Sequence, residues 1–438
     1  MKILFTANDL GGGMGHVRRS RMLAKTLQKL GAEVAFLVHT DKALQHLSPD
    51  FTVYQETFPM EKWEIFLKSK ISPIHPIPED PSKNNPFFWE FNSLNYQVLR
   101  DGYFTSGITE RRFRQLKKIV EEFKPDIMIN DGHLLAYFLR RFFQIPLVQI
   151  VRFAVFPENP QLLWWKTPPE GLQPPGAMAA FQGLFRQIKE SPAEEACCLL
   201  KGDGYLIPAD GEVEPVQTNA PHLFLGYHVD SDWDPRLLDV DTKPRLKKVF
   251  VTIGAGAQRN RVASFYQFLV NTLKDESLQV IFSDPFQVLS QDFQKQKYPQ
   301  ISVYKWIESS TVFPYLHLVI HHGGYSTTLE ALWWGVPSLV LPFHSEQEGN
   351  GRRLQRLNAG EIVNVANTPY DPVWFRSSFG RYSLMGGFDF ALTEDKLKDK
   401  IHQILSDNTY KNKAEEQSKK LKSQFNPAKI GSFIGQFV

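Results

Sequence analysis

The chain contains one pattern twice: a short apolar run, then a glycine-rich stretch, then a helical periodicity. In the first copy the apolar run Lys2–Thr6 precedes the glycine-rich residues 11–15. Leucines then recur at helical spacing between His16 and Leu30, Gly31 ends the helix, and Glu33–His39 supplies the next apolar run. Strand, helix and strand in this order predict a βαβ unit, since parallel strands need a crossover connection.

The second copy begins near the middle of the chain, with the strand Lys248–Ile253, the loop Gly254–Gly256, a helix over Val262–Leu273 and the strand Leu278–Ser283. Four further apolar runs predict buried parallel strands: Pro125–Asn130, Ile145–Val151, Ile301–Tyr304 and Leu318–His321. Ser338–Pro342 predicts another. The fold class predicted is α/β, with two doubly wound Rossmann-like domains facing a cleft.

With 438 residues, the chain is long enough for two or three domains. We predict an N-terminal domain over 1–228, a linker over 229–247 that is rich in Asp and Pro, and a C-terminal domain over 248–410. Residues 411–438 complete a charged helix, Asp395–Phe425, and a short tail that is expected to pack back on the N-terminal domain.

Composition and charge exclude several classes of protein. The formal net charge is only +3, so a nucleic-acid partner is not expected. No apolar run reaches the roughly 18 residues that span a bilayer, and the start of the chain lacks a signal-peptide core. The two cysteines, Cys197 and Cys198, are adjacent, too close for an ordinary disulfide. We expect a cytoplasmic protein, with peripheral membrane contact left open.

The first candidate site residue is His16, which follows Gly15 at the start of a predicted helix. The glycine stretch fits neither the GxGxxG spacing nor a P-loop, although a helix N-terminus after glycines binds phosphate in general. His16 is placed beyond the strand ends, where open α/β sheets bind ligands. The alternative is a histidine that caps the helix.

A denser group of polar residues and glycines follows the predicted strand Leu318–His321. Glycines allow backbone amides to approach a phosphate, and Ser, Thr and His add donors at a helix N-terminus. Glu330, further along the helix, can accept both hydroxyls of a ribose. A tight turn with a solvated Glu explains the glycines but not the other residues. The group comprises His321, His322, Gly323, Gly324, Tyr325, Ser326, Thr327, Thr328, Glu330, Glu346, Gln347 and Asn350.

The stretch His322–Asn350, HGGYSTTLEALWWGVPSLVLPFHSEQEGN, closely resembles the donor-binding box of GT-B fold glycosyltransferases that use nucleotide sugars. This family includes the plant-type and antibiotic-type glucosyltransferases and the lipid II-forming N-acetylglucosaminyltransferases. The resemblance covers nearly the whole chain and is best over Trp306–Gly360. It implies a donor site made of Gly15, Gly254, Trp306, Ile307, His322, Gly323, Gly324, Ser326, Thr327, Glu330, Glu346 and Gln347.

The same resemblance implies a role for several of these residues. His322, Gly324 and Thr327 would contact the donor phosphates, and Glu330 would hold the ribose hydroxyls. Trp306 would stack on the base while backbone atoms of Ile307 read its edge. Glu346 and Gln347 match the pair that binds sugar hydroxyls.

In the N-terminal half, the resemblance makes His16 the general base and Asp131 the residue that orients it. Asp131 has a second interpretation, equal in weight, as the cap of a helix that begins near His133. Residues 15–20 read Gly-His-Val-Arg-Arg-Ser, and GHxxR also resembles nucleotide-sugar hydrolases of this fold. Arg18 and Arg19 are interpreted as solvated helix residues rather than as an anion site.

These patterns predict an inverting glycosyltransferase that moves a sugar from a nucleoside-diphosphate sugar, most readily a UDP-sugar, to an acceptor hydroxyl. A nucleotide-sugar hydrolase or epimerase and a non-catalytic donor-binding subunit are the alternatives. No cofactor is expected, and no metal, because no His, Cys, Asp or Glu cluster has ligand spacing. A surplus of aromatic residues in irregular segments favours an apolar or planar small molecule or a lipid as acceptor: Phe87, Phe88, Trp89, Phe153, Phe156, Trp164 and Trp165.

Overall fold

The chain folds into two compact units, each assembled from separate stretches of sequence. The first unit combines Met1–Leu225, Tyr370–Gly386 and Asn426–Val438, and the second combines Gly226–Pro369 and Gly387–Phe425. The computed structural model describes residues 1–10, 14–56, 77–229, 246–253, 259–289, 298–307, 309–363, 370–389 and 392–438.

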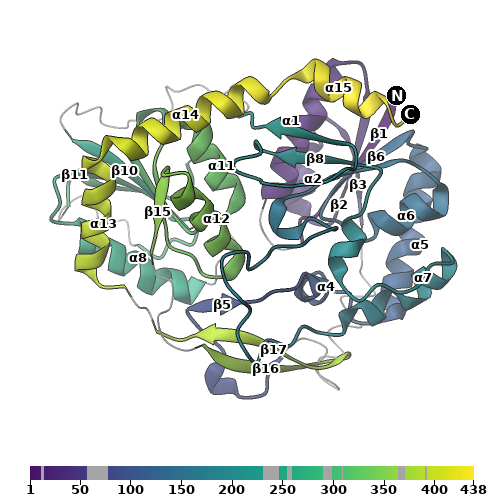
Figure 1. Cartoon of the computed structure of the whole chain (residues 1–438), viewed down its shortest axis with the longest axis horizontal. Helices are drawn as coiled ribbons and strands as arrows, with labels where there is room; N and C mark the ends of the chain where they lie inside the picture. Colours follow the sequence, from purple (N-terminus) through teal and green to yellow (C-terminus); the bar gives the residue numbers. More distant parts are fainter. Residues whose placement is uncertain are drawn as a thin grey trace. The chain divides into compact units, whose positions relative to one another are not determined.

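A seven-stranded sheet forms the centre of the first unit, in the order β3-β2-β1-β6-β7-β8-β9 (Figure 1). The neighbouring strands from β3 to β8 pair in parallel. The strands β1, β6 and β7 are almost entirely buried, as expected of strands covered on both faces. The strands are β1 (Lys2–Ala7), β2 (Glu33–Val38), β3 (Thr52–Gln55), β6 (Ile127–Asp131), β7 (Leu147–Ile150), β8 (Gly204–Pro208) and β9 (His222–Gly226).

Each helix of this unit buries part of its surface, and α1 packs on strands of the sheet. In α1 (Gly15–Lys29) the buried apolar residues include Val17, Leu23 and Leu27, and the chain leaves the helix at Gly31, whose φ of 89° suits glycine. The Thr105 side chain caps α5 by accepting from the amide of Ile108. The other helices are α2 (Asp41–Leu47), α4 (Asn95–Arg100), α5 (Ser106–Phe123), α6 (Ala136–Phe143), α7 (Gln182–Gln187) and α15 (Pro427–Gly435).

A second, four-stranded sheet belongs to the first unit although half of it comes from far along the chain. Its order is β4-β16-β17-β5, and Figure 1 shows β16 and β17 as a hairpin next to β5. These strands are β4 (Ile77–Pro78), β5 (Phe88–Glu90), β16 (Asp371–Ser377) and β17 (Gly380–Gly387). We predicted a C-terminal domain over 248–410, whereas the structure assigns Tyr370–Gly386 to the first unit.

The second unit contains a six-stranded parallel sheet in the order β12-β11-β10-β13-β14-β15, which is the doubly wound order with β10 as the first strand. Its strands are β10 (Lys247–Thr252), β11 (Leu278–Ser283), β12 (Ile301–Tyr304), β13 (Leu318–His321), β14 (Ser338–Val340) and β15 (Gly360–Ile362). Its helices are α8 (Arg259–Leu273), α10 (Ser309–Val312), α11 (Tyr325–Trp334), α12 (Ser345–Arg356), α13 (Glu394–Ser406) and α14 (Asn408–Gln424).

The C-terminal segment differs from the single long helix predicted over Asp395–Phe425. Asp407 interrupts it with extended backbone dihedrals, and its side chain caps α14 by accepting from the amide of Thr409. After Asn426 the tail forms α15, which contacts α1 of the first unit where Gly431 lies against Leu30. The N-terminal stretch of the first unit ends at Leu225, near the predicted domain end at residue 228. Most of the predicted linker, 229–247, lies outside the described residues.

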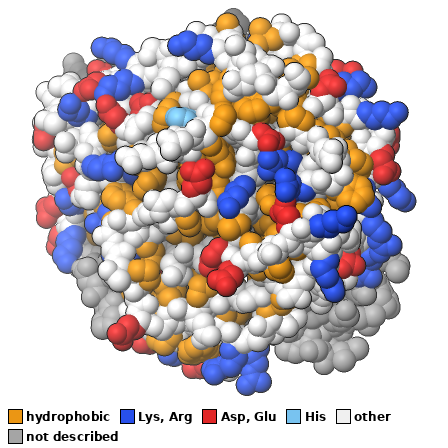
Figure 2. Space-filling view, turned by 45° about the vertical axis from the view of Figure 1, so that its right-hand side comes forward, with side chains coloured by type: hydrophobic (Ala, Val, Ile, Leu, Met, Phe, Trp, Pro, Cys, Tyr) orange, Lys and Arg blue, Asp and Glu red, His pale blue; other side chains and the backbone are white. Residues whose placement is uncertain are grey.

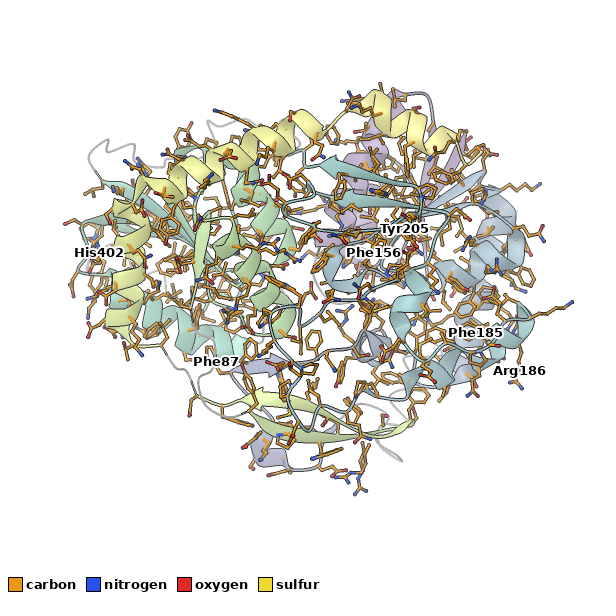
Figure 3. The ribbon with its side chains drawn as sticks, in the orientation of Figure 1. Phe87, Phe156, Phe185, Arg186, Tyr205 and His402 are labelled. Carbon is orange, nitrogen blue, oxygen red and sulfur yellow. The ribbon has the colours of Figure 1, made fainter. Side chains whose placement is uncertain are left out.

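Two of the aromatic residues expected to face an acceptor are part of the core instead. Phe88 is 1% exposed and stacks on Tyr370. Phe156 is 2% exposed and packs against Tyr205, and both rings are labelled in Figure 3. These residues bury large apolar surfaces in the first unit. Their side chains therefore give no support to an apolar or planar acceptor.

The surface agrees with the small net charge. On the described atoms of the face drawn in Figure 2, basic and acidic side chains alternate among apolar and uncharged ones. No helix in the described ranges is both long and apolar enough to cross a membrane.

Candidate functional site

His16 and Asp131 meet at the carboxyl edge of the first unit's sheet. Asp131 is the last residue of β6, which pairs in parallel with β1, and His16 is the second residue of the helix that follows β1. The distance from His16 Nδ1 to Asp131 Oδ1 is 2.6 Å. Asp131 is buried, whereas the His16 side chain keeps 32% of its surface exposed. The ring therefore remains open to a reactant.

The capping interpretations of both residues are excluded by the helix starts. Met14 is the N-cap residue of α1, so His16 lies inside the helix. The helix after β6 begins at Ala136 with Leu135 as its N-cap residue and no side-chain cap, so Asp131 does not cap it.

Arg19 is a third member of this site, and the expectation that it is solvated was wrong. It is 8% exposed, and its Nε and NH2 groups each donate to one oxygen of Asp131 at 2.5 Å. Burial alone would raise the pKa of Asp131, but Arg19 and His16 together lower it to about 2. The carboxylate is therefore ionised at any physiological pH.

The pKa of His16 is held below its ordinary value. Burial has the largest effect, and the charges of Arg19 and Arg152 act in the same direction, against the opposing effect of Asp131. His16 is therefore neutral at pH 7, as a general base must be before it accepts a proton.

Gly132 makes room for the His16 ring, and we did not predict this role. Its φ is +77°, and a Cβ there would lie 3.2 Å from Cε1 of His16. The side chain of Asn8 donates to the carbonyl of Gly132 at 3.1 Å and to Asp101 at 2.6 Å, which fixes the turn. The signal in the sequence is the Asp-Gly pair that ends the strand.

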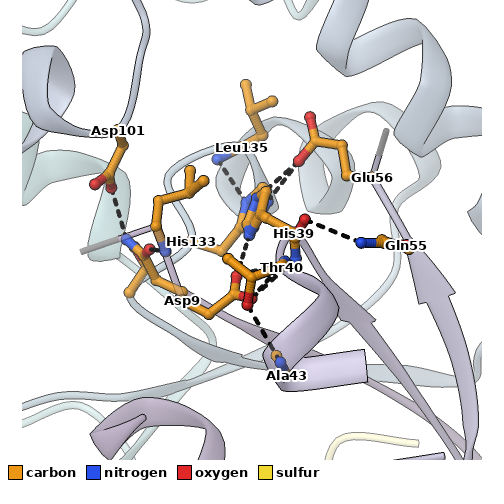
Figure 4. A network of polar contacts seen from close by, with 12 residues as sticks. Asp9, His39, Thr40, Ala43, Gln55, Glu56, Asp101, His133 and Leu135 are labelled. Atoms are coloured by element: carbon orange, nitrogen blue, oxygen red, sulfur yellow. Dashed lines mark hydrogen bonds and ion pairs between the residues drawn. The ribbon is translucent and has the colours of Figure 1, made fainter. Parts of the chain in front are cut away.

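A second polar cluster lies nearby in the same unit, at the ends of β1, β2 and β6 (Figure 4). His39 lies between two carboxylates, with Nδ1 2.5 Å from Asp9 and Nε2 2.7 Å from Glu56. Arg112 donates to Glu56 at 2.9 Å, and His133 Nε2 is 3.1 Å from His39 Nε2. The five side chains are all buried.

Within the described part of the chain, one group of side chains could hold a metal ion, although the spacing of residues in the sequence predicted none. One ligand atom each from His39, Glu56 and His133 lies within 4.8 Å of the others. However, the amide of Leu135 donates to Nδ1 of His133 at 3.3 Å, so the proton of the neutral ring sits on Nε2, the atom that a metal would need. The cluster suits a proton better than a metal ion.

His39 is the residue of this cluster that carries the extra proton. Burial alone would lower the pKa of His39, but Glu56 and Asp9 raise it to about 9. The pKa of His133 is lowered by burial. Protonated His39 and Arg112 then balance ionised Asp9 and Glu56, which leaves the buried cluster neutral in total.

In the second unit, the predicted donor residues follow the carboxyl ends of parallel strands. Trp306 and Ile307 follow β12, His322 to Glu330 follow β13, and Glu346 with Gln347 follow β14. Parallel strands end at one edge of a sheet, so these residues share that edge. Gly254 lies outside the described residues.

The turn between β13 and α11 has no space for side chains at its two glycines. Gly323 has a φ of +82°, and a Cβ there would lie 2.6 Å from the carbonyl of Gln347. A Cβ on Gly324 would lie 2.4 Å from Nε2 of His322. Asn350 donates to the carbonyl of Gly323 at 2.8 Å. The His322 ring is thus held against the start of a helix, where amide groups favour an anion.

The two histidines of this turn are neutral. Burial and the neighbouring His322 lower the pKa of His321 to about 3. Burial and the nearby His344 lower the pKa of His322 to about 4. His321 accepts a hydrogen bond from the amide of Gly323 at 3.1 Å, so its role is to shape the turn.

The remaining donor candidates differ in how accessible they are. Trp306 is 49% exposed, as a base-stacking residue must be, whereas Ile307 is 8% exposed. Ser326, Thr327 and Glu330 are half-buried on α11. The side-chain oxygen of Gln347 accepts from the amide of Phe343 at 2.8 Å, which orients the side chain and uses one of its acceptor lone pairs. Gly15 is the first residue of α1.

Comparisons with known proteins find glycosyltransferases. The family model described as the glycosyltransferase family 28 C-terminal domain matches residues 248–371. The chain is 28% identical over 100 residues to a putative UDP-glucuronosyltransferase of Caenorhabditis elegans, covering 22% of this chain and 17% of that protein. It is 32% identical over 132 residues to the NDP-glycosyltransferase YjiC of Bacillus subtilis, covering 28% and 30%. The chain thus spans less than a third of the length of these curated relatives.

A longer alignment joins the chain to the UDP-N-acetylglucosamine–N-acetylmuramyl-(pentapeptide) pyrophosphoryl-undecaprenol N-acetylglucosamine transferase of Halothermothrix orenii, with 20% identity over 377 residues, 83% of this chain and 85% of that one. Among solved structures, the calicheamicin glycosyltransferase CalG4 superposes with a TM-score of 0.70 at 15% identity, covering 100% of this chain and 98% of that one.

The glycosyltransferase of kitacinnamycin superposes on the chain with a TM-score of 0.67 at 16% identity, covering 100% of this chain and 99% of that one. The predicted α/β class is therefore confirmed, and the chain has the GT-B fold of two Rossmann-like domains. The predicted resemblance to nucleotide-sugar glycosyltransferases of that fold is likewise confirmed, since the family 28 C-terminal domain model matches residues 248–371.

Proposed function

We propose that this chain is an inverting glycosyltransferase that moves a sugar from a nucleoside-diphosphate sugar to an acceptor hydroxyl. The observation that carries the proposal is the 2.6 Å contact between the half-exposed His16 and the buried, ionised Asp131. A neutral imidazole that is oriented by a carboxylate is a suitable general base for a hydroxyl.

The proposed reaction is a single displacement. With its Nδ1 proton held by Asp131, His16 accepts the acceptor proton on Nε2 while the hydroxyl oxygen attacks the anomeric carbon. The bond from that carbon to the diphosphate breaks in the same step, so the configuration inverts. The amides at the start of α11 and His322 stabilise the leaving diphosphate, and we propose that no metal ion is needed.

UDP is the donor nucleotide that we propose. Glu330 lies on α11 beyond the proposed phosphate site, and a carboxylate there can accept both ribose hydroxyls, one of which a deoxyribose lacks. Relatives with printed names that contain UDP or NDP support a nucleoside-diphosphate donor. A structural neighbour, the spinosyn rhamnosyltransferase SpnG, was solved with thymidine diphosphate, so dTDP sugars belong in the test.

A product screen tests the proposal. The full chain is incubated with UDP- and dTDP-sugars, with and without pooled aliphatic, phenolic, glycan and lipid acceptors, and products are identified by mass spectrometry. We expect a glycosylated acceptor with inverted anomeric configuration by NMR, and only slow release of free sugar without acceptor. Stoichiometric free sugar at speed without acceptor would favour the hydrolase instead, and donor binding with no turnover would favour a binding subunit.

A further inference from the structure

Arg19 is not used by the proposed reaction, yet it is built into the same site. It lies three residues after His16 on α1, so the two side chains share one helix face. Its fork binds both oxygens of Asp131, and its NH2 group lies 2.8 Å from Nδ1 of His16. Ser20 Oγ lies 3.5 Å from Oδ2 of the same carboxylate.

The position of the His16 proton follows from these distances. Asp131 is ionised, so an Nδ1 without a proton would set a lone pair against a carboxylate oxygen only 2.6 Å away. The proton therefore sits on Nδ1, and the Arg19 protons point to the carboxylate. Nε2 keeps its lone pair, which is the arrangement that a general base requires.

Charge has the opposite effect once His16 becomes protonated. The Asp131 carboxylate favours an imidazolium, but the guanidinium of Arg19 already balances that carboxylate and stands next to the ring. The charged groups that act on the ring are Asp131 on β6, Arg19 on α1 and Arg152 after β7. Two of the three are cations.

We propose that Arg19 is a positioning residue, which fixes the Asp131 carboxylate on both oxygens and thereby keeps the His16 ring unprotonated and correctly oriented. The spacing GHxxR acquires a physical reason, because only an arginine can bind both carboxylate oxygens with a rigid fork from that turn of the helix. The catalytic part of this role rests on the proposed function, but the effect on the ring does not.

Three variants separate charge, geometry and general damage to the helix. Arg19→Met removes the charge and keeps the length, Arg19→Lys keeps the charge and loses the fork, and Arg18→Met is a matched control at the neighbouring, half-buried position. Because Arg19→Met leaves a buried carboxylate unbalanced, the same change is also made in an Asp131→Asn background.

The first readout is an NMR titration of the Cε1–H signal of His16 in 13C-histidine protein, assigned with His16→Gln. We expect Arg19→Met to raise the pKa of His16 by about one unit or more, in both backgrounds. Arg19→Lys should leave it within about half a unit, and Arg18→Met likewise. An unchanged or lower pKa in both Arg19→Met proteins would overturn the proposal, whatever happens to thermal stability.

The second readout is the pH profile of kcat with the donor and acceptor identified by the screen. Arg19→Met should move the acid limb to higher pH in step with the NMR value, and Arg19→Lys should lower the plateau by up to about 100-fold without moving that limb. A uniform loss of kcat with a fixed acid limb in Arg19→Met would show that Arg19 only supports the fold. If the wild type transfers no sugar, the proposed function fails, and the titration still decides the role of Arg19.

Discussion

The large sheets of the two units have corresponding strand orders. The residues at their carboxyl edges, however, differ in charge. In the first unit, the carboxylates that contact His16 and His39 are each matched by a cation: Asp131 by Arg19, Asp9 by His39, and Glu56 by Arg112. In the second unit, the turn at the start of α11 contains two histidines that remain uncharged. The first edge therefore carries paired charges next to its histidines, whereas the histidines of the turn before α11 are uncharged.

This difference fits two different tasks. Compensated ion pairs hold an imidazole in one orientation and one protonation state, as a proton acceptor requires. A neutral turn of glycines and amides keeps its capacity for an incoming anion, because among the described residues no side chain caps α11 and its first turn contains no acidic residue. We interpret the first edge as the site of proton transfer and the second as the site of the diphosphate.

The largest expected effect separates the two edges by turnover. His16→Ala should lower kcat by about 100-fold to 10,000-fold, because it removes a general base, and should leave the affinity for the donor nearly unchanged. Steady-state kinetics with the best donor and acceptor check the first part. If kcat stays within a few fold of wild type, the first edge does not perform the proton transfer.

The next prediction tests whether His39 at the first edge carries the proton that balances the buried carboxylates. His39 has a folded pKa of about 9, above its ordinary value of 6.5, so its stabilising effect is full below pH 6.5 and is lost as the pH rises through 9. Urea unfolding should show a loss on the order of 1 to 3 kcal/mol between pH 6.5 and 9.5.

The controls for that loss are His39→Gln and His222→Gln. The first should flatten the pH dependence over this window, and the second, at an exposed histidine, should keep it. Equal slopes in wild type and His39→Gln would mean that the cluster around His39 does not hold the proton.

The smallest effect tests the geometry of the second edge. Gly324→Ala should weaken donor binding by about tenfold, since its Cβ would displace the His322 ring and shift the start of α11. Gly435→Ala is the matched control, because nothing lies within 4 Å of a Cβ there. Fluorescence titration with UDP measures both, and equal affinities would remove His322 from the proposed phosphate site.

Much of the framework follows from local sequence. The strands Leu278–Ser283, Ile301–Tyr304 and Leu318–His321 have the predicted bounds, because buried parallel strands are short apolar runs closed by polar residues. The break at Asp407 was missed since its helical pattern continues on both sides, and only the cap reveals it. The hairpin of β16 and β17 was also missed, because its partner strands lie in distant sequence.

The site shows the same limit. His16 was singled out because a histidine after a glycine loop is conspicuous, but Arg19 looked like any charged helix residue until β6 placed a carboxylate against it. The cluster of His39, Glu56 and His133 is likewise invisible to spacing rules, since three separate strand ends bring it together. These contacts depend on which strands pair in the folded chain, and local sequence patterns do not show that pairing.

The central claim is that the first edge transfers the proton and the second edge binds the diphosphate. Calorimetric titration of UDP into wild type, His16→Ala and Glu330→Ala tests it most directly. We predict that wild type and His16→Ala bind UDP with equal affinity, and that Glu330→Ala binds at least about tenfold more weakly, because its ribose acceptor is gone. Weakening of UDP binding by His16→Ala as large as that by Glu330→Ala, or no UDP binding by the wild type, would contradict the account.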